Sequence, residues 1–377
     1  MTPPTLLLLG GYGNTGCALA GLLLEHTGVH LRVAGRNGSK AQAEAAGWNS
    51  RYPGDRVRGL AADASDRRSL RAACEGAQWL IAASSTSGQA GIVAEVALEA
   101  GLDYMDPQFS RAKLAVLTSL AQRIETAGRC FVTDAGFHPG LPAALVRFAA
   151  TQFEALHRAR MGSVIQIDWA SLEVSPATVD ELVAEFRDFQ SLHFEAGRWR
   201  SMGWLESFRP VWMDFDHGFG RRYTMPMFLE ELRPLPASIP SLVETGFFVG
   251  GFNWFVDWIL LPVIMGVLQI APHRGAPAAG RLLLWGLKRF TPPPYGTLLR
   301  LEAQGSTAGV ESRLVVTVFH PDGYLLTAAP MAACLMQLLD GSARRPGLHY
   351  QAWVVEPKRF LDDLQTMGVE VSVRREA

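Results

Sequence analysis

The 377-residue sequence lacks the short motifs that mark several large enzyme classes. It has no HExxH zinc motif, no GxSxG nucleophile motif, and no tyrosine followed four positions later by lysine. A zinc peptidase, an α/β-hydrolase and a typical short-chain dehydrogenase are therefore not expected. The four cysteines form no CxxC pair, and no metal site is expected. We predict that all of them are buried free thiols, namely Cys17, Cys74, Cys130 and Cys334.

Charge is also scarce in this chain. Charged residues make up 19% of the sequence, and 35 Lys and Arg nearly balance 36 Asp and Glu. Because there is no basic stripe, nucleic acid is not an expected partner. At the N-terminus no basic region precedes the apolar run 5–9, which is followed directly by two glycines, so no signal peptide is expected. We therefore expect a cytoplasmic protein, long enough for two domains.

Short apolar runs alternate with helix-like stretches over the first 150 residues. Such runs are typical of parallel strands that are buried on both faces. The alternation predicts an α/β fold, a Rossmann doubly wound parallel sheet, over residues 1–150. The expected strands are 5–9, 29–34, 57–61, 79–83, 103–105 and 130–133, and the expected helices are 12–25 and those that start near residues 39, 67, 89, 111 and 140.

The pattern changes after about residue 160, and residues 151–326 are predicted to form an inserted α+β domain for substrate binding or dimerisation. Its expected elements are a strand at 164–174, a helix at 178–189, a hairpin of 297–304 with 310–320 around a turn at 305–309, and a second turn at 322–323. Residues 327–377 are predicted to pack back on the Rossmann domain, with helices at 328–339 and 357–366 and a strand at 369–373.

One long apolar stretch, residues 246–272, carries a single charge, Asp257. Its length suits a bilayer span, but a charge near the centre costs about 2.5–3.5 kcal/mol on insertion scales, and Pro262 interrupts the helix. We expect a buried core or homodimer-interface element. A peripheral contact with lipid or a membrane surface, and a true span, stay open as alternatives.

The strongest motif is the glycine-rich run Gly11, Tyr12, Gly13, Asn14, Thr15 and Gly16, placed between an expected strand and an expected helix. Its GxGxxG spacing in this context is typical of dinucleotide binding. Gly11 is predicted to allow the tight turn, Gly13 to let a pyrophosphate approach the backbone, and Gly16 to let helix and strand pack closely. The helix N-terminus then offers backbone N–H groups to the phosphates.

The end of the second expected strand carries Arg36, Asn37 and Lys40 in place of an acidic residue. An acid at this point binds the 2′-hydroxyl of NAD, whereas an arginine suits the 2′-phosphate of NADP. The motif favours NADP, with NAD less favoured. A solvated loop cation remains the alternative for Arg36. Asp63, after the third strand, is a candidate contact for the adenine or a solvated loop residue.

Polar residues follow the later strands as well. Ser84, Ser85 and Thr86 are candidates to hold the nicotinamide ribose, or to cap the next helix. Beyond them, His138 is a candidate proton donor or acceptor, with Asp134 or Asp106 orienting it. A histidine in a helix-capping loop without a chemical role is the alternative.

At these residues the chain resembles the saccharopine dehydrogenase-like oxidoreductases. The resemblance rests on LLLLGGYGNTG, VAGRNGSKAQA, LDYMDPQF, DAGFHPGLP and the late segment EPKRFLDDLQTMGV. It implies a Rossmann domain completed by the C-terminal segment, an inserted α+β domain, and NAD(P)-linked redox chemistry at a C–N or C–C unsaturated bond.

The middle of the chain departs from that family. Residues 164–290 hold seven of the ten tryptophans and the apolar stretch, and the arginine cluster that a dicarboxylic amino-acid substrate needs is not found there. The sequence therefore predicts an NADP-dependent oxidoreductase that transfers a hydride between NADPH and a C=N, C=O or C=C bond of a small apolar or amphipathic substrate. A non-catalytic NADP-binding module with a membrane-surface or partner-binding role is the alternative.

Overall fold

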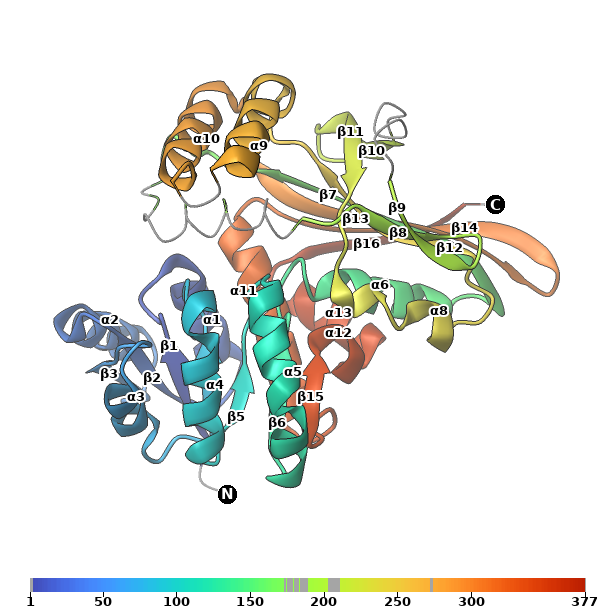
Figure 1. Cartoon of the computed structure of the whole chain (residues 1–377). Coiled ribbons are helices and arrows are strands. Elements are labelled where there is room, and N and C mark those ends of the chain that lie inside the picture. The colour runs from blue at the N-terminus through green and yellow to red at the C-terminus, as the bar shows by residue number, and fades with distance from the viewer. Residues whose placement is uncertain are drawn as a thin grey trace. The chain divides into compact units, whose positions relative to one another are not determined.

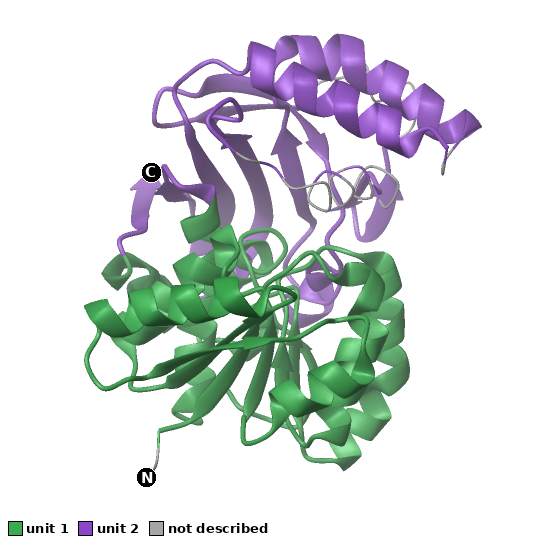
Figure 2. Ribbon diagram, turned by 90° about the vertical axis from the view of Figure 1, so that its left-hand side faces the viewer, with its two compact units in different colours: residues 1–144, 324–367 green, residues 145–323, 368–377 purple. Residues whose placement is uncertain are grey.

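The computed structural model describes residues 3–172, 174, 179, 183, 189–202, 211–271 and 274–376. They divide into two compact units (Figures 1 and 2). The first contains residues 1–144 and 324–367, and the second contains residues 145–323 and 368–377. Each unit is therefore assembled from separate parts of the chain.

The first unit is built on a parallel sheet with the strand order β15-β6-β5-β4-β1-β2-β3. Helices cover both faces of this sheet (Figure 2). The fold is the predicted doubly wound α/β fold. Its strands are β1 Thr5–Leu9, β2 His30–Gly35, β3 Val57–Ala61, β4 Trp79–Ala82, β5 Asp103–Met105, β6 Cys130–Thr133 and β15 Gly347–Tyr350. Its helices are α1 Asn14–His26, α2 Gly38–Arg51, α3 Arg67–Cys74, η1 Ser87–Gln89, α4 Ala90–Glu99, α5 Arg111–Thr126, α12 Gln351–Val354 and α13 Pro357–Thr366.

The strands form where the sequence is apolar on both sides of the chain. In β1, Leu6, Leu7, Leu8 and Leu9 are all at most 2% exposed, so both faces of the strand are covered. Several helices begin where a polar side chain satisfies the first free N–H groups. For example, Asn37 accepts from Lys40 N at α2, and Ser110 accepts from Lys113 N at α5.

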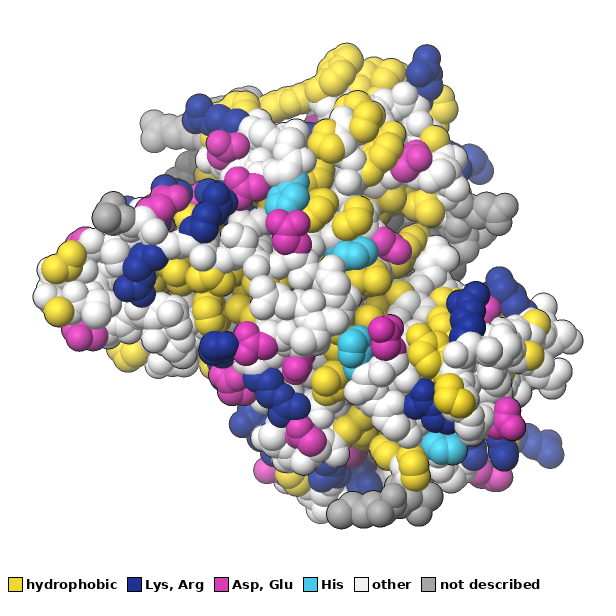
Figure 3. Space-filling model, turned by 180° about the vertical axis from the view of Figure 1, so that it is seen from behind, with side chains coloured by type: hydrophobic (Ala, Val, Ile, Leu, Met, Phe, Trp, Pro, Cys, Tyr) yellow, Lys and Arg dark blue, Asp and Glu magenta, His cyan; other side chains and the backbone are white. Residues whose placement is uncertain are grey.

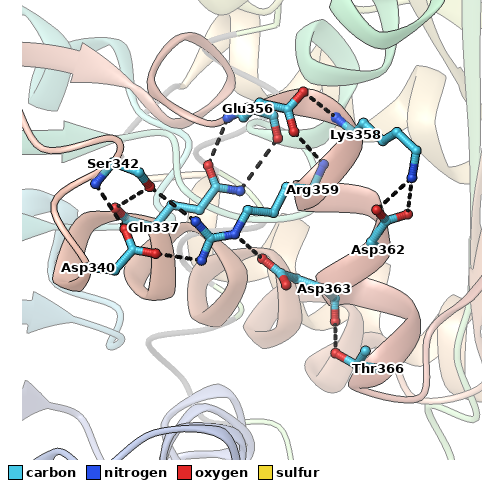
Figure 4. A network of polar contacts seen from close by, with 9 residues as sticks. All are labelled: Gln337, Asp340, Ser342, Glu356, Lys358, Arg359, Asp362, Asp363 and Thr366. Atoms are coloured by element: carbon cyan, nitrogen blue, oxygen red, sulfur yellow. Dashed lines mark hydrogen bonds and ion pairs between the residues drawn. The ribbon is translucent and has the colours of Figure 1, made fainter.

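The C-terminal part of the first unit is fixed by a polar network between α11 (Gly323–Leu339) and α13 (Figure 4). The Gln337 side chain accepts from Glu356 N at 2.8 Å, and Glu356 caps α13 through Lys358 N and Arg359 N. The Arg359 guanidinium reaches Asp340 at 2.6 Å on the other helix. These contacts hold residues 324–367 as part of the Rossmann-type unit.

The second unit is built on a nine-stranded mixed sheet. Seven strands follow the order β10-β11-β12-β7-β13-β14-β16, and β8 and β9 extend from β12. The strands are β7 Ala155–Gln166, β8 Leu192–Glu195, β9 Arg198–Ser201, β10 Val211–Phe215, β11 Gly220–Pro226, β12 Glu244–Gly250, β13 Gly296–Thr307, β14 Val310–His320 and β16 Glu370–Glu376. Its helices are η3 Glu230–Leu232, α8 Leu235–Ser238, η4 Val256–Leu260, α9 Leu261–Ile270 and α10 Ala276–Phe290, and α6 Leu141–Ala150 leads into the unit.

The predicted hairpin of this α+β unit is present, with a shorter turn than expected. β13 and β14 pair in antiparallel register up to Thr307 and Val310. Only Ala308 and Gly309 connect them, both with positive φ, as a two-residue hairpin turn requires. The predicted second turn at 322–323 is wrong, because α11 begins at Gly323.

Two predicted strands need correction. The strand expected at 164–174 is β7, which starts nine residues earlier and ends at Gln166, because its first half alternates buried residues with exposed Arg158 and Arg160. The strand expected at 369–373 does not pack on the Rossmann domain. It is β16, which pairs with β14 in the second sheet. The helix expected at 178–189 lies almost wholly outside the described residues.

The apolar stretch 246–272 is divided among the end of β12, a π-helical turn η4, and α9. Val256, Leu260, Ile264 and Leu268 form a stripe that packs on α10, with Trp169 and Val183 in the same cluster. The opposite side of the helix is also apolar and is exposed, so the expectation of a buried element holds for one side only. Among the described residues, no helix is long and apolar enough to cross a membrane.

Candidate nucleotide-binding site

The predicted cofactor residues gather at one edge of the parallel sheet. Because the strands run in one direction, the loops after β1, β2, β3 and β4 all leave from their carboxyl ends. β1 lies between β4 and β2, so the strand order changes direction beside it. Such a switch point is where open α/β sheets bind ligands.

The glycine loop at this switch point is packed too tightly for side chains at most of its glycines. Gly10 has φ +84°, and a Cβ there would lie 2.4 Å from Ser84 Cβ. A Cβ on Gly16 would lie 2.2 Å from the Gly10 carbonyl oxygen, so this glycine is what lets α1 approach the loop. A Cβ on Gly11 would lie 2.9 Å from the Leu8 carbonyl oxygen, so the turn has no room for a side chain there either.

Gly13 differs from its neighbours because its α-carbon faces open space. It is exposed, and a Cβ there would contact only the Gly10 carbonyl oxygen, at 3.2 Å. Gly13 is also the N-cap of α1, where no side chain accepts from the first N–H groups. Exposed Asn14 and half-buried Thr15 follow it. An uncapped helix N-terminus beside bare backbone fits a phosphate group.

The end of β2 is organised by Tyr12. Its ring lies against Gly35, where a Cβ would approach it to 2.5 Å, and its hydroxyl accepts from Asn37 N at 3.1 Å. Lys40 Nζ lies 5.2 Å from the centre of the same ring. Tyr12 therefore joins the glycine loop to the loop that carries Arg36.

Arg36 itself is exposed at this loop. Asp63, at the end of β3, accepts from Ser65 N at 2.9 Å and from Ser65 Oγ at 2.7 Å. These two hydrogen bonds lower the pKa of Asp63, and the nearby Arg36 adds to the shift. The structure thus places Arg36, Asn37, Lys40 and Asp63 together at the side of the sheet where β2 and β3 end.

The loop after β4 is held by a residue that the sequence had not indicated. Gln108 Nε2 donates to the Ser84 carbonyl oxygen at 2.5 Å and to Thr86 Oγ1 at 2.9 Å. Ser85 between them is exposed. Gln108 Oε1 is buried without a hydrogen-bond partner among the described residues. A buried acceptor at a strand end fits a ligand that donates a hydrogen bond.

Beyond this loop lies a buried ionic cluster centred on Lys113. Its Nζ is 2.7 Å from Asp106 Oδ1 and 2.9 Å from Asp134 Oδ1, and all three side chains are at most 2% exposed. Lys113 also donates to the Gln108 carbonyl oxygen. Burial opposes the charge on Lys113, but the two carboxylates outweigh it and raise its pKa.

The same cluster reaches β5 and β6. Asp106 Oδ2 accepts from Thr133 Oγ1 at 3.0 Å. Burial, together with the charge and the hydrogen bond of Asp106, raises the pKa of Tyr104 well above its ordinary value. Asp134 has φ +52°, a conformation that costs free energy in a residue other than glycine. The two aspartates thus tie together the loops after β5 and β6.

His138 follows in the loop after β6. Both ring nitrogens are buried, and the ring packs on Phe137 with their centres 4.6 Å apart. Burial lowers the pKa of His138 to about 4, against a hydrogen bond with its own backbone. With this pKa the imidazole is neutral near pH 7, the form in which it can accept a proton or donate a hydrogen bond.

A sequence signal for Lys113 exists, but it is weak. The buried side of α5 is made of Lys113, Leu117, Leu120 and Ile124, spaced by four, three and four residues. A lysine at the first position of an apolar stripe is unusual, because lysine is almost never fully buried unless it is paired. Gln108 has no comparable signal.

Comparison with known proteins agrees with this arrangement. Residues 6–130 match the model of the saccharopine dehydrogenase NADP binding domain. A search of curated proteins returned no match. Among solved structures, the chain is similar to apo saccharopine dehydrogenase (L-Glu forming) from Saccharomyces cerevisiae, with a TM-score of 0.69 and 13% identity over 99% of this chain and 100% of that one.

A second structure, the DAP dehydrogenase of C. glutamicum in complex with DAP, gives a TM-score of 0.47 and 12% identity, covering 97% of this chain and 99% of that one. Its similarity is too low to support any inference here. The similarity to the yeast enzyme shows the fold of the whole chain, and at this identity it shows nothing about the substrate.

Residues 6–130 therefore match a dinucleotide-binding domain, and the whole chain has the fold of the yeast enzyme. More particularly, its first unit contains a saccharopine dehydrogenase-type NADP-binding domain, so the cofactor is NADP. This confirms the resemblance drawn from the sequence motifs.

Proposed function

We propose that this oxidoreductase transfers a hydride between NADPH and a C=N, C=O or C=C bond of a small apolar or amphipathic molecule. The observation that carries the proposal is the uncapped N-terminus of α1 beside Gly13, at the switch point of the parallel sheet. When bound, the nicotinamide supplies the hydride. The protein supplies the position of the cofactor and the surroundings of the reacting bond.

Each part of the strand-end edge has a role in this proposal. Gly13 and the first N–H groups of α1 hold the pyrophosphate, and Arg36 with Lys40 binds the 2′-phosphate. Ser84, Ser85 and Thr86, held in place by Gln108, face the nicotinamide ribose. Tyr12 keeps the two phosphate-binding loops in register.

The substrate class follows from the arginines of the second unit. Two enclosed arginines among its described residues are already satisfied by protein groups. Arg222 donates to Gln166 Oε1 at 2.6 Å and to the Phe219 carbonyl oxygen at 3.0 Å. Arg300 contacts Asp216 at 3.0 Å and Glu302 at 2.9 Å. Neither is available as a clamp for a carboxylate of a dicarboxylic substrate, which favours a less polar one.

We further propose revised roles for the three residues first considered for proton transfer. Asp106 and Asp134 serve Lys113, and the three together position the loop that carries Gln108. His138 acts in its neutral form, as a hydrogen-bonding group that polarises the substrate rather than protonating it, a mode that a neutral imidazole supports.

The test is oxidation of NADPH followed with a panel of ketones, imines and enoyl esters carrying short or long alkyl chains. We expect turnover with at least one apolar member, a preference for NADPH over NADH, and poor turnover with dicarboxylic imines. Saturable NADPH binding without turnover of any member would contradict the substrate proposal. A faster reaction with a dicarboxylic imine would contradict the argument from the satisfied arginines.

A further inference from the structure

The strongest feature left unexplained by hydride transfer is the exposed side of the α9–α10 helix pair in the second unit. α9 continues from η4 and packs on α10 through the buried stripe described above. On the other side lie seven large apolar residues that are each between 37% and 88% exposed. We call this set the apolar face: Trp254, Trp258, Ile259, Val263, Val267, Ile270 and Trp285.

Aromatic contacts connect part of the apolar face across the two helices. Phe255 joins its two helices, because its ring lies 5.5 Å from that of Trp254 and 6.0 Å from that of Trp285, both in edge-on contact. From Trp258 the face runs along α9 to Ile270, the most exposed of its members. In Figure 3, hydrophobic side chains run along the top of the view, at the end of the molecule where Figure 1 shows α9 and α10, and basic side chains lie beside them.

The one acidic residue within the apolar stretch points away from this face. Asp257 is mostly buried and its Oδ1 accepts from Phe252 N at 2.9 Å. A Cβ placed on Gly251 would lie 1.9 Å from Asp257 Oδ2, so this carboxylate is directed against the backbone at the end of β12. It therefore adds no negative charge to the exposed side.

The charges that α9, α10 and the turn between them carry have one sign. Between Asp257 and Glu302 the sequence contains no acidic residue. It contains four exposed cations in the same interval, Arg274, Arg281, Lys288 and Arg289, and within the described chain none of them forms an ion pair. On α10, Arg281 lies four residues before Trp285, and Lys288 and Arg289 lie three and four residues after it. These four side chains are therefore on one side of that helix.

Exposed tryptophans beside these cations favour one of two partners for the apolar face, a second copy of the chain or a lipid surface. In a symmetric dimer the same patch meets itself, so the cations of one copy would approach those of the other, and α9 and α10 themselves carry no acid to offset them. An anionic lipid surface has the complementary charge, and tryptophans flanked by Lys and Arg are typical of the membrane–water interface. Helices with an exposed apolar side and basic neighbours lie in the plane of that interface.

We propose that the α9–α10 pair binds the surface of an anionic lipid bilayer, with the apolar face inserted at the headgroup level and the four cations against the lipid phosphates. The contact is peripheral, which agrees with the absence of a spanning helix from the described residues. It goes beyond the oxidoreductase activity and does not depend on it.

The test is flotation of the full-length chain with vesicles of phosphatidylcholine containing about one third phosphatidylserine, and with vesicles of phosphatidylcholine alone. We expect binding to the anionic vesicles, weaker binding to the neutral ones, and release by high salt. The double variant Val263→Asp/Ile270→Asp and the double variant Arg281→Glu/Arg289→Glu should each lose at least ~10-fold in binding to anionic vesicles.

Two matched controls lie on other parts of the same unit. Val310 is 68% exposed at the β13–β14 turn, and Arg198 is exposed on β9, so Val310→Asp and Arg198→Glu should bind vesicles like the wild type. Equal loss in the controls, or no binding by the wild type, would overturn the proposal. Thermal unfolding and NADPH affinity, both expected to be unchanged, show that the variants are folded.

Light scattering in detergent-free buffer tests the remaining alternative, that the apolar face is a homodimer interface. We expect a mass that is the same for the wild type and for Val263→Asp/Ile270→Asp. If the wild type is instead a dimer that this variant converts to a monomer, and neither binds vesicles, the apolar face is an interface between two copies and the lipid proposal is wrong.

Discussion

The two units bury ionisable groups in opposite ways. In the first unit, Lys113 is fully buried but lies between two carboxylates, and the nearby His138 is kept neutral by a pKa lowered to about 4. In the second unit, Asp257 is buried at the start of η4, and burial raises its pKa to about 6, against its hydrogen bond from Phe252 N and the charge of Arg222. Ionisation thus stabilises the Lys113 cluster, whereas it costs free energy at Asp257.

The two units therefore differ in where they place their polar and apolar side chains. The first concentrates its polar groups inside, where they fix the loops of a binding edge. The second keeps few charges inside but leaves large apolar side chains outside, at α9 and α10. Stability measurements can therefore test the contrast, because removing the charge of Lys113 should destabilise the first unit, whereas removing that of Asp257 should stabilise the second.

The largest effect is expected for Lys113→Met. Without the cation, two buried carboxylates remain close together, and breaking a buried ion pair in this way typically costs about 3–5 kcal/mol of unfolding free energy. The loss is measured by chemical denaturation, with hydrogen exchange of the amides in the first unit as the readout. Lys358→Met is the control, because its pair with Asp362 is exposed and should cost less than ~1 kcal/mol. Equal losses in the two variants would contradict the role of the cluster.

The next effect concerns cofactor affinity alone. Gly13→Val places a side chain where the phosphates are expected, so NADP affinity should fall at least ~100-fold, about 2.7 kcal/mol, with the fold retained. Fluorescence titration with NADPH measures it. Gly28→Val is the matched control, since a Cβ there meets nothing within 4 Å and the residue lies at the opposite edge of the sheet, before β2. Normal affinity in a folded Gly13→Val protein would sink the phosphate assignment.

For His138 we expect stability to fall with acid. Its folded pKa of about 4 lies below the ordinary 6.5, so between these values the unfolded chain binds more protons. Stability of the first unit is thus lost as the pH falls from about 6.5 to 4, by at most ~3 kcal/mol. His138→Gln should remove that slope in hydrogen exchange measured across this range. An unchanged slope would show that His138 is not the titrating group.

For Asp257 the sign is reversed. Its folded pKa of about 6 lies above the ordinary 3.8, so the folded chain binds more protons between these values. Stability of the second unit therefore falls as the pH rises from about 4 to 6, again by at most ~3 kcal/mol. Asp257→Asn should remove this loss and make the unit more stable at neutral pH. Destabilisation by Asp257→Asn at pH 7 would mean that the ionised carboxylate is needed.

The smallest effect is expected for Arg36→Asp. The acid would repel a 2′-phosphate and accept from a 2′-hydroxyl, so the preference for NADP over NAD should shift by ~10–100-fold toward NAD. Affinities for both cofactors give the ratio. Arg58→Asp, at an exposed position within β3, should leave the ratio unchanged. The assignment fails if the wild type already prefers NAD.

The binding edge could be predicted from the sequence because its elements are short and local. The strands β1, β3, β5 and β6 have the predicted bounds. β1, β5 and β6 are buried, and a glycine or a polar residue lies at the end of each. Arg36, Ser84 and Asp134 follow such runs, so their common edge follows from parallel order alone. Gln108 and Lys113 could not be assigned in this way, because their importance depends on which loops meet.

The second unit was less predictable for physical reasons. In β7 the exposed positions Arg158 and Arg160 are paired with Glu244 on β12, and no local pattern indicates a partner 84 residues away. β16 has only partly buried residues, and its sheet is decided by pairing with β14. The apolar stretch 246–272 was visible, but hydrophobicity alone does not tell a core from an exposed surface.

The pairing of β16 with β14 also has a consequence for folding during synthesis on the ribosome. β14 is complete by His320, but its partner along one edge is formed only by residues 370–376. Until those residues leave the ribosome, β14 presents an open row of backbone donors and acceptors, which is a template for pairing with another chain. A truncation before residue 370 would leave this edge open permanently.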